Sequence, residues 1–337
     1  MHRKGTIATS GYDPLTKDTI NCPSRHFISG KAMKKLAFLI IAIGFAISGC
    51  KKEEGCIFFF RRLNPGKGNP AEICVIEPDG KNTKTIFSKK SPFFGTEIDV
   101  SPDGKKIAFY EIRDGKEVAI YIMDVDGKNE YKLIGDYNNG EPSWSPDGKK
   151  IAFSSDRDGK SNEIYVIDID GKNLLKLTEN SLMSTSPSWS FDGEKIIFDS
   201  IIKEDIPNFK DYLNDEIFII GLDGKGLKRL TNNYENDENP SYSPDGSKIA
   251  FTRGLLASKL YIMDPDGSNQ IQLTEENMYV SYLCWSPDSK KIVFSGSNRD
   301  MEWDDLYTID IQTKKIKNLT NTKDFDESSP RWRSVSK

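Results

Sequence analysis

Short apolar runs separated by turn-forming residues recur along the chain. The clearest case is residues 142–153, where Ser143-Trp144-Ser145 and Ile151-Ala152-Phe153 flank a Pro-Asp-Gly sequence. Proline fixes φ near the value that a turn requires, and Asp-Gly readily adopts the positive φ of a tight hairpin. The pattern therefore predicts a strand, a turn and a returning strand. Because one hairpin cannot bury its apolar faces alone, the fold depends on whether the pattern repeats.

The hairpin occurs five times, and its first serine recurs at spacings of 44, 45, 53 and 43 residues. Each hairpin is followed by an apolar run of the type Ile-Tyr-Ile-Met-Asp, as at residues 120–124, and then by a short run that most often ends in Leu-Thr, as at residues 177–178. These two later motifs each occur six times. Four short strands in about 45 residues is the repeat of a β-propeller blade. The turn serines are Ser101, Ser145, Ser190, Ser243 and Ser286.

The position of the first-strand motif predicts how the ring closes. The motif is absent before Cys56, yet it appears as Ser329-Pro330-Arg331-Trp332 at the C-terminus with no hairpin after it. The simplest arrangement places this last strand in the first blade, which removes the open strand edges. The sequence thus predicts an all-β fold: a six-bladed β-propeller of four-stranded antiparallel blades over residues 56–337, closed by the C-terminal strand.

The N-terminal residues differ from the repeats. Residues 1–32 are polar and have no period, so we expect them to be disordered or untranslated. Residues 33–49 contain two lysines, a 12-residue apolar run and a small-residue ending, which is typical of a secretory signal and too short for a membrane span. The sequence around Cys50 resembles the lipobox of bacterial lipoproteins, in which the cysteine becomes the lipidated first residue. Residues 50–55 would then be a lipid-anchored linker, and Lys51 after the cysteine favours the outer membrane, facing the periplasm.

Charge and histidine content exclude several classes of function. Residues 1–49 hold seven Lys/Arg and two Asp/Glu, which leaves 40 basic and 49 acidic residues and a formal charge of −9. This balance disfavours nucleic acid, whose binding depends on neutralising phosphates. The two histidines, His2 and His26, precede the expected cleavage point. A Ser-His-Asp triad and imidazole metal ligands are therefore not expected, and no cofactor is expected, but a carboxylate-based active site stays open.

Cysteines and acidic turns offered two further candidate sites. Cys56 and Cys74 fall on neighbouring predicted strands, and export permits oxidation, so they form a candidate disulfide; two buried thiols are the alternative. Asp-x-Asp-Gly sequences, as at residues 124–127, lack the spacing of a calcium loop. Because they recur once per blade, we expect turns stabilised by Asp and Asn rather than a metal site.

The repeat resembles that of the TolB family, with its Trp-Ser-Pro-Asp-Gly-x-x-Ile-Ala-Phe hairpin and trailing Leu-Thr, from Gly55 to Trp332. Phe191, Ser289 and Tyr242 depart from the pattern and concern local turns or packing. The α/β domain that precedes the propeller in TolB has no counterpart, so the resemblance implies a TolB-like relative. Peptidase propellers of the prolyl-oligopeptidase type are also similar, but the Gly-x-Ser-x-Gly elbow of their hydrolase domain is absent.

Two functions remain open for such a protein. The favoured one is a monomeric, lipid-anchored scaffold of the cell envelope that binds a protein, peptide or glycan. The alternative is a polysaccharide lyase or hydrolase with a carboxylate site at the channel mouth. Binding residues usually lie on variable loops of a rigid frame, and here these loops carry acids among aromatics. The candidate rim residues are Phe94, Glu97, Glu141, Tyr234, Asp237, Glu238, Tyr279, Trp303, Asp326 and Glu327.

Overall fold

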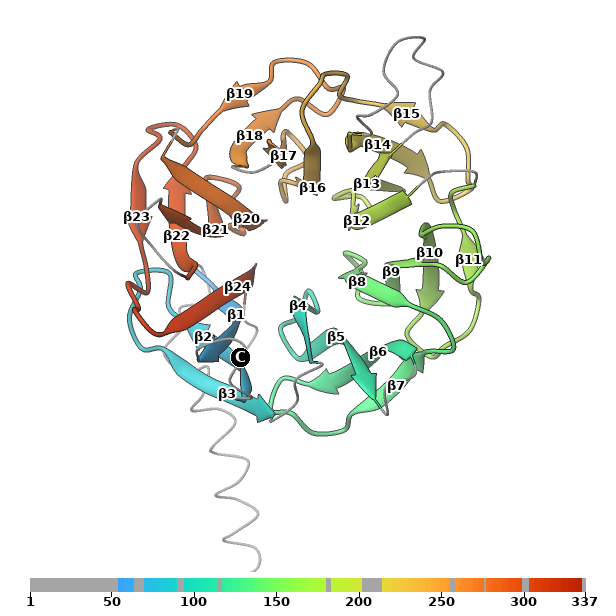
Figure 1. Cartoon of the computed structure of the whole chain (residues 1–337), viewed down its shortest axis with the longest axis horizontal. Coiled ribbons are helices and arrows are strands. Elements are labelled where there is room, and N and C mark those ends of the chain that lie inside the picture. Colours follow the sequence, from blue (N-terminus) through green and yellow to red (C-terminus); the bar gives the residue numbers. More distant parts are fainter. Residues whose placement is uncertain are drawn as a thin grey trace, which may run out of the picture. The chain divides into compact units, whose positions relative to one another are not determined.

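The computed structural model describes residues 54–63, 70–89, 94–113, 117–179, 183–201, 214–254, 258–275, 277–298 and 303–334. These residues form six four-stranded antiparallel sheets arranged as a ring (Figure 1). The six-bladed all-β propeller predicted from the repeats is therefore confirmed. The predicted signal peptide and Cys50 lie outside the described residues. No helix in the described part is long and apolar enough to cross a membrane.

Each blade runs from an innermost strand at the central opening to an outermost strand at the perimeter (Figure 1). The innermost strands are β4 (Phe94–Val100), β8 (Asn139–Trp144), β12 (Met183–Trp189), β16 (Asp237–Tyr242), β20 (Met278–Trp285) and β24 (Phe325–Arg333). The second strands are β1 (Cys56–Leu63), β5 (Lys106–Arg113), β9 (Lys150–Ser155), β13 (Lys195–Ile201), β17 (Ile249–Arg253) and β21 (Lys291–Asn298).

The third and fourth strands complete the blades. The third strands are β2 (Ala71–Ile76), β6 (Glu117–Asp124), β10 (Glu163–Asp168), β14 (Glu216–Gly221), β18 (Lys259–Met263) and β22 (Asp305–Asp310). The outermost strands are β3 (Lys84–Lys89), β7 (Tyr131–Ile134), β11 (Leu175–Lys176), β15 (Lys228–Arg229), β19 (Ile271–Gln272) and β23 (Ile316–Asn318).

Ring closure occurs in the first blade, whose strand order is β24-β1-β2-β3. The last strand pairs antiparallel with the first, from Cys56 opposite Arg333 to Leu63 opposite Phe325. The indole N–H of Trp332 also donates a hydrogen bond of 2.7 Å to the carbonyl of Glu54. The predicted closure by the C-terminal strand is confirmed.

Each recurring motif has a structural cause. The serine that opens a hairpin donates to the turn aspartate and accepts a backbone N–H, as Ser145 does with Asp147 at 2.7 Å and Lys150 at 2.9 Å. The threonine of Leu-Thr accepts the backbone N–H at the start of the third strand, as Thr178 does from Ile164 at 2.9 Å. The phenylalanine of Ile-x-Phe stacks on the aromatic ring of the third strand in five blades, with centroids 5.5–6.0 Å apart.

The carboxylates of the Asp-x-Asp-Gly turns accept hydrogen bonds from their own turn and from the adjacent second strand. Asp124 accepts hydrogen bonds from the side chains of Lys106, at 2.8 Å, and Asn129, and Asp126 accepts from the backbone N–H of Lys128 at 3.1 Å. Among the described residues, no group of three or more His, Cys, Asp or Glu side chains is arranged to hold a metal ion. The hydrogen bonds from Lys128 and Asn129 are those expected of a turn stabilised by Asp and Asn.

The candidate disulfide between Cys56 and Cys74 is wrong. Cys74 is a buried, free thiol that lies opposite Phe59 in the β1–β2 pairing. Because successive strand residues point to opposite faces of a sheet, Cys56 shares the face of Phe58 whereas Cys74 shares the face of Phe59. The two sulfurs lie in different core clusters and do not meet.

Candidate functional site

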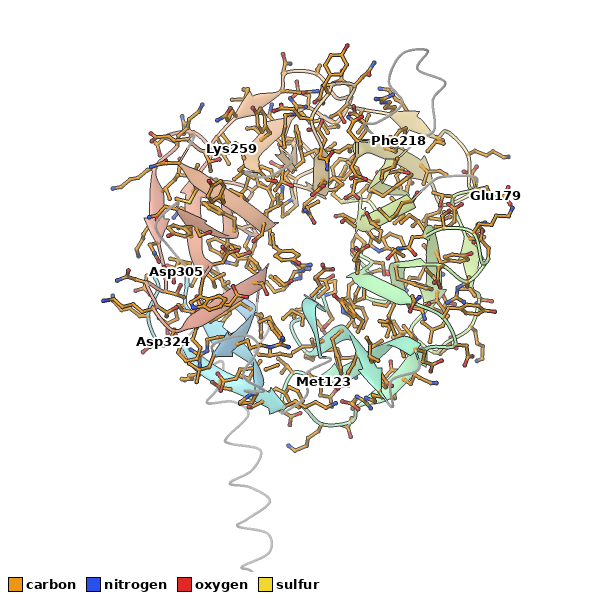
Figure 2. All side chains as sticks on the ribbon, viewed as in Figure 1. Met123, Glu179, Phe218, Lys259, Asp305 and Asp324 are labelled. Atoms are coloured by element: carbon orange, nitrogen blue, oxygen red, sulfur yellow. The ribbon has the colours of Figure 1, made fainter. Side chains whose placement is uncertain are left out.

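A β-bulge at the same place in the innermost strands shapes the central channel. In β8, β12 and β16 the pairing register shifts where Glu141, Ser186 and Asn239 stand, and each of these residues has a positive φ of 49–55°. Ser329 has the same φ of 49° in β24. Bulges of this kind redirect a side chain and often occur beside functional sites. Figure 2 shows side chains from the innermost strands projecting into the opening.

Two of the predicted rim acids meet inside this channel. Glu97 on β4 and Glu141 on β8 line a cavity of about 120 Å³ together with Ser186, Tyr282 and Arg331. The Tyr282 hydroxyl donates a hydrogen bond of 3.2 Å to Glu97 Oε1, and the backbone N–H of Ser186 donates one of 2.7 Å to Glu141 Oε2. The two carboxyl groups are thus held by neighbouring blades at the mouth of the channel.

Burial governs the protonation of this pair. Burial raises the pKa of Glu97, although the charge of Arg331 acts in the opposite direction. Burial, together with the nearby charges of Glu97 and Asp199, raises the pKa of Glu141 to about 8. Like charges that share a poorly solvated site cannot all ionise at neutral pH without a large cost. Glu141 therefore holds a proton at neutral pH.

The sequence prediction missed Asp199, which extends the acidic site behind the channel. This residue on β13 accepts the backbone N–H of Asn239 at 3.0 Å and the Thr185 hydroxyl, and burial raises its pKa. The charge of Asp199 also helps to raise the pKa values of Asp215 and Glu238. Burial and the charges of Asp199 and Glu238 raise the pKa of Asp215 to about 7.

A cluster of charged side chains around Asp99 lines the same cavity as Glu97 and Glu141. Asp99 Oδ1 accepts hydrogen bonds from Arg333 at 2.7 Å and from Arg331 at 3.1 Å, while its Oδ2 accepts the backbone N–H of Trp144 at 2.8 Å. Because both arginines lie on the closing strand β24, this cluster joins the last strand to the second blade. The guanidinium of Arg331 also lines the cavity of Glu97.

The opposite end of the channel is aromatic and repetitive. A cavity of about 330 Å³ there is bordered by the indoles of Trp144, Trp189, Trp285 and Trp332. The hairpins around it pack in sequence: Pro102 lies against Gly148, and the ring of Phe191 lies directly over Gly246. We call this end, formed by the Ser-Pro-Asp-Gly hairpins and the Asp-x-Asp-Gly turns, the hairpin end, and the opposite end the rim.

Two of the predicted rim acids are buried. Asp237 is completely buried and forms a two-bond ion pair with Arg253, with its oxygens 2.6 and 2.7 Å from Nε and Nη2. Glu327 is also completely buried, which raises its pKa to about 8. Neither carboxylate is therefore exposed to solvent, and a binding role for these two residues stays a prediction. The adjacent Glu238 and Asp326 are half-buried, and burial raises the pKa of each.

The predicted aromatics whose side chains are described do not line the cavity of Glu97 and Glu141. Tyr234 is 86% exposed in the connection between the fourth and fifth blades. The ammonium of Lys259 lies over the ring of Tyr279, 5.1 Å from its centroid. Trp303 is half-buried just before β22. Phe94 begins β4, but its side chain lies outside the described part of the chain. The aromatic side chain that reaches the channel acids is instead Tyr282.

Comparison with known families decides the assignment of the fold. The family described as the TolB beta propeller domain matches residues 55–203 and 209–335. The chain belongs to this family. Members of the TolB beta propeller family share the ring just described, and the resemblance predicted from the hairpin motif is confirmed. The family supports a binding scaffold in general terms.

Solved structures show the same ring. TolB from Acinetobacter baumannii is 24% identical, with a TM-score of 0.68 over 89% of this chain and 71% of that chain. An oligogalacturonate lyase in complex with manganese is 16% identical, with a TM-score of 0.51 over 79% of this chain and 74% of that chain. The uncharacterized peptidase YuxL of Bacillus subtilis (strain 168) is 32% identical over 98 residues. That match spans 28% of this chain and 15% of the relative's length.

Proposed function

We propose that this TolB-type propeller is a binding scaffold of the cell envelope, anchored through a lipid on Cys50, whose channel mouth takes a basic segment of a protein or peptide. The observation that carries the proposal is the pairing of Glu97 and Glu141 in one cavity with raised pKa values. A lysine or arginine that enters this cavity relieves the repulsion between the two carboxylates. Charge complementarity of this kind gives specificity and fast association.

Proton linkage makes the proposal testable. A basic ligand favours the ionised form of Glu141, whose pKa in the free protein is raised to about 8. Binding therefore releases a proton, and affinity should rise as the pH rises towards 8 and level off above it. A ligand recognised by stacking or by neutral hydrogen bonds alone would not show this dependence.

The experiment is a calorimetric titration of the unlipidated propeller with an oligolysine peptide in two buffers of different ionisation enthalpy. We expect proton release at pH 7 and tighter binding at pH 8.5. The double variant Glu97→Gln/Glu141→Gln should weaken binding by at least about tenfold, which is roughly 1.4 kcal/mol. Glu194→Gln, an exposed acid of the hairpin end, is the matched control and should bind normally. Equal affinity of the double variant and the wild type would contradict the proposal.

A second candidate, a polysaccharide-acting enzyme, is favoured by the similarity to oligogalacturonate lyase. Glu97, Glu141 and Arg331 border one cavity, so acid–base chemistry by a carboxyl pair is available there. That neighbour holds manganese, but no described group of His, Cys, Asp or Glu side chains here fits a metal. We therefore derive no step through a metal. A polyuronate would also bring its own negative charge to an acidic mouth.

Turnover separates the two candidates. The purified propeller is incubated with polyuronates and with neutral glycans, and unsaturated or reducing ends are measured. The scaffold proposal expects no product above that of the Glu97→Gln/Glu141→Gln variant. Product formation that is lost in this variant would replace the scaffold by the enzyme.

The anchor is tested by the intact mass of protein extracted from membranes. We expect a chain that starts at Cys50 and carries acyl groups, because each buried CH₂ contributes about 0.8 kcal/mol and several chains hold a protein stably. A mature chain that starts at Cys50 without added acyl mass would contradict the anchor.

A further inference from the structure

The propeller chain starts at the hairpin end of the ring. Trp332 donates its indole N–H to the carbonyl of Glu54, and a Cβ added at Gly55 would meet the carbonyl of Arg333 at 2.5 Å. Arg333 in turn donates to the carbonyl of Val100 at 2.9 Å, immediately before the first Ser-Pro-Asp-Gly hairpin. Glu54 also borders a cavity with Pro287 and Asp288 of the last hairpin. Residue 54 is therefore fixed beside the hairpins, far from the acidic mouth.

We propose that the hairpin end of the propeller faces and rests on the bilayer that holds the Cys50 anchor, so that the acidic channel mouth opens away from the membrane. This orientation rests on the proposed lipid anchor. It adds the surface that the lipid covers and the direction from which a partner must approach.

The length of the tether excludes the reverse orientation. Five residue steps separate Cys50 from Gly55, and a fully extended chain spans at most about 18 Å over five residues. The innermost strands contain 6–9 residues, so the two ends of the ring lie about 20–30 Å apart at 3.3 Å per residue. The tether is therefore too short to run along the ring and bring the rim to the lipid.

The surface of the hairpin end fits a lipid headgroup layer. Six of the nine exposed large apolar side chains of the described residues lie there, on Phe191 of a hairpin and at or just before the starts of the outermost strands. Leu227 and Phe191 are 55% and 52% exposed. The six belong to four consecutive blades, the second to the fifth, and are Tyr131, Leu174, Leu175, Phe191, Leu227 and Ile271.

Charge at the hairpin end also favours this orientation. Several acids of its turns are paired with exposed lysines of the same turns, as Asp126 is with Lys128 at 2.6 Å and Asp170 with Lys172 at 3.0 Å. Lysine stems lie on apolar surface while their ammonium groups reach lipid headgroups. Anionic lipids attract such lysines and repel unneutralised carboxylates. The exposed lysines of these turns, such as Lys128 and Lys172, can therefore contact an anionic headgroup layer.

The experiment measures the distance of each end from the membrane. Mature lipoprotein is reconstituted into vesicles of phosphatidylethanolamine and phosphatidylglycerol that contain a nickel-chelating lipid. A nitroxide is attached to Leu227→Cys at the hairpin end or to Tyr234→Cys at the rim, two positions on either side of β15, the outermost strand of the fourth blade. The described free thiols, Cys74 and Cys284, are buried and so are protected from the label. Because about 20 Å of chain separates the two positions, we expect nickel to relax the Leu227 label at least about threefold more than the Tyr234 label.

The outcomes separate the orientation from the anchor. Flotation with the vesicles is measured first, against Cys50→Ser, so failure of the anchor appears as wild-type protein that does not float. If the protein floats but nickel relaxes both labels equally, or the Tyr234 label more, the orientation is overturned. A variant with twenty Gly/Ser residues inserted after Lys52 has a tether of about 25 Å root-mean-square length. Its labels should lose most of their difference, and an unchanged difference would overturn the tether as the cause.

Discussion

The two ends of the channel use the same side chain in opposite ways. At the hairpin end, hydrogen bonds from Ser145, Ser190 and Ser243 lower the pKa of the turn aspartates that follow them. At the rim, burial raises the pKa of Glu141 and Glu238. A carboxylate surrounded by donors stays charged and stabilises a turn, whereas one placed among other acids away from water stays available for a ligand. The environment, rather than the residue type, distinguishes frame from site.

The largest expected effect comes from removing the strand that both ends share. β24 carries Asp326 at the rim and Trp332 at the hairpin end, and it pairs along the whole of β1. A chain that ends at Asp324 should lose cooperative unfolding, because the first blade keeps three strands with an open inner edge. Circular dichroism during heating measures this loss. Removal of Val335–Lys337 alone is the control, and an unchanged melting temperature in the longer deletion would contradict ring closure by β24.

Two adjacent rim acids should differ sharply in their effect on stability. Asp237→Asn breaks the buried pair with Arg253, which leaves an uncompensated guanidinium and should cost about 3–5 kcal/mol of unfolding free energy. Glu238→Gln removes a half-buried carboxyl whose pKa burial has raised, so it should leave stability nearly unchanged or slightly higher. Chemical denaturation compares the two variants. Similar losses in both would show that Asp237 has no special structural part.

A single hairpin carboxylate should have a moderate effect. Asp147→Ala removes the acceptor of the Ser145 hydroxyl at 2.7 Å and of the Lys149 N–H at 3.0 Å. The turn should lose about 1 kcal/mol, a decrease of about 2–4 °C in melting temperature. Asp147→Asn keeps an acceptor oxygen in the same place and should recover most of the loss. If both variants melt together, the turn does not depend on this acceptor.

The last effect depends on pH and concerns Glu141. Its folded pKa of about 8 lies above the ordinary glutamate value of 4.5, so the folded state binds more protons between these values. Stability from this group is therefore complete below the ordinary glutamate value, falls as the pH rises from there to about 8, and is lost above 8. Glu141→Gln should match the wild type near pH 5 and melt higher at pH 9. Parallel melting curves from pH 5 to 9 would contradict the raised pKa.

The repeat allowed the fold to be predicted, because each motif states a local physical requirement. Ser-Pro-Asp-Gly, Ile-x-Phe and Leu-Thr correspond to a turn, a stacked ring and a strand cap, and their register fixes the strand order. In the core, only the predicted disulfide was wrong. Cys56 and Cys74 were assigned to neighbouring strands, but the motifs do not show which face of its strand each cysteine occupies. Cys56 and Cys74 lie on opposite faces.

The site was predicted less well for the same physical reason. Asp237-Glu238 and Asp326-Glu327 were each placed together at the rim, but strand alternation buries one member of each pair. Asp199 was missed although a signal exists in the sequence. It follows the phenylalanine of Ile-x-Phe, a position held by Ser154, Thr252 and Ser295 in other blades, and a lone carboxyl there stands out. The pKa values depend on distances between blades, and the sequence of a single repeat does not determine these distances.

The pairing of β1 with β24 also sets the order of events during synthesis. The hydrogen bond from Trp332 to Glu54 joins residues 278 positions apart. At 5–20 residues per second, synthesis of a chain of 337 residues takes roughly 17–67 s. The first strand to be made thus waits for the last before its inner edge is covered. Each blade between them can form early, but the ring cannot close until the C-terminal strand has left the ribosome.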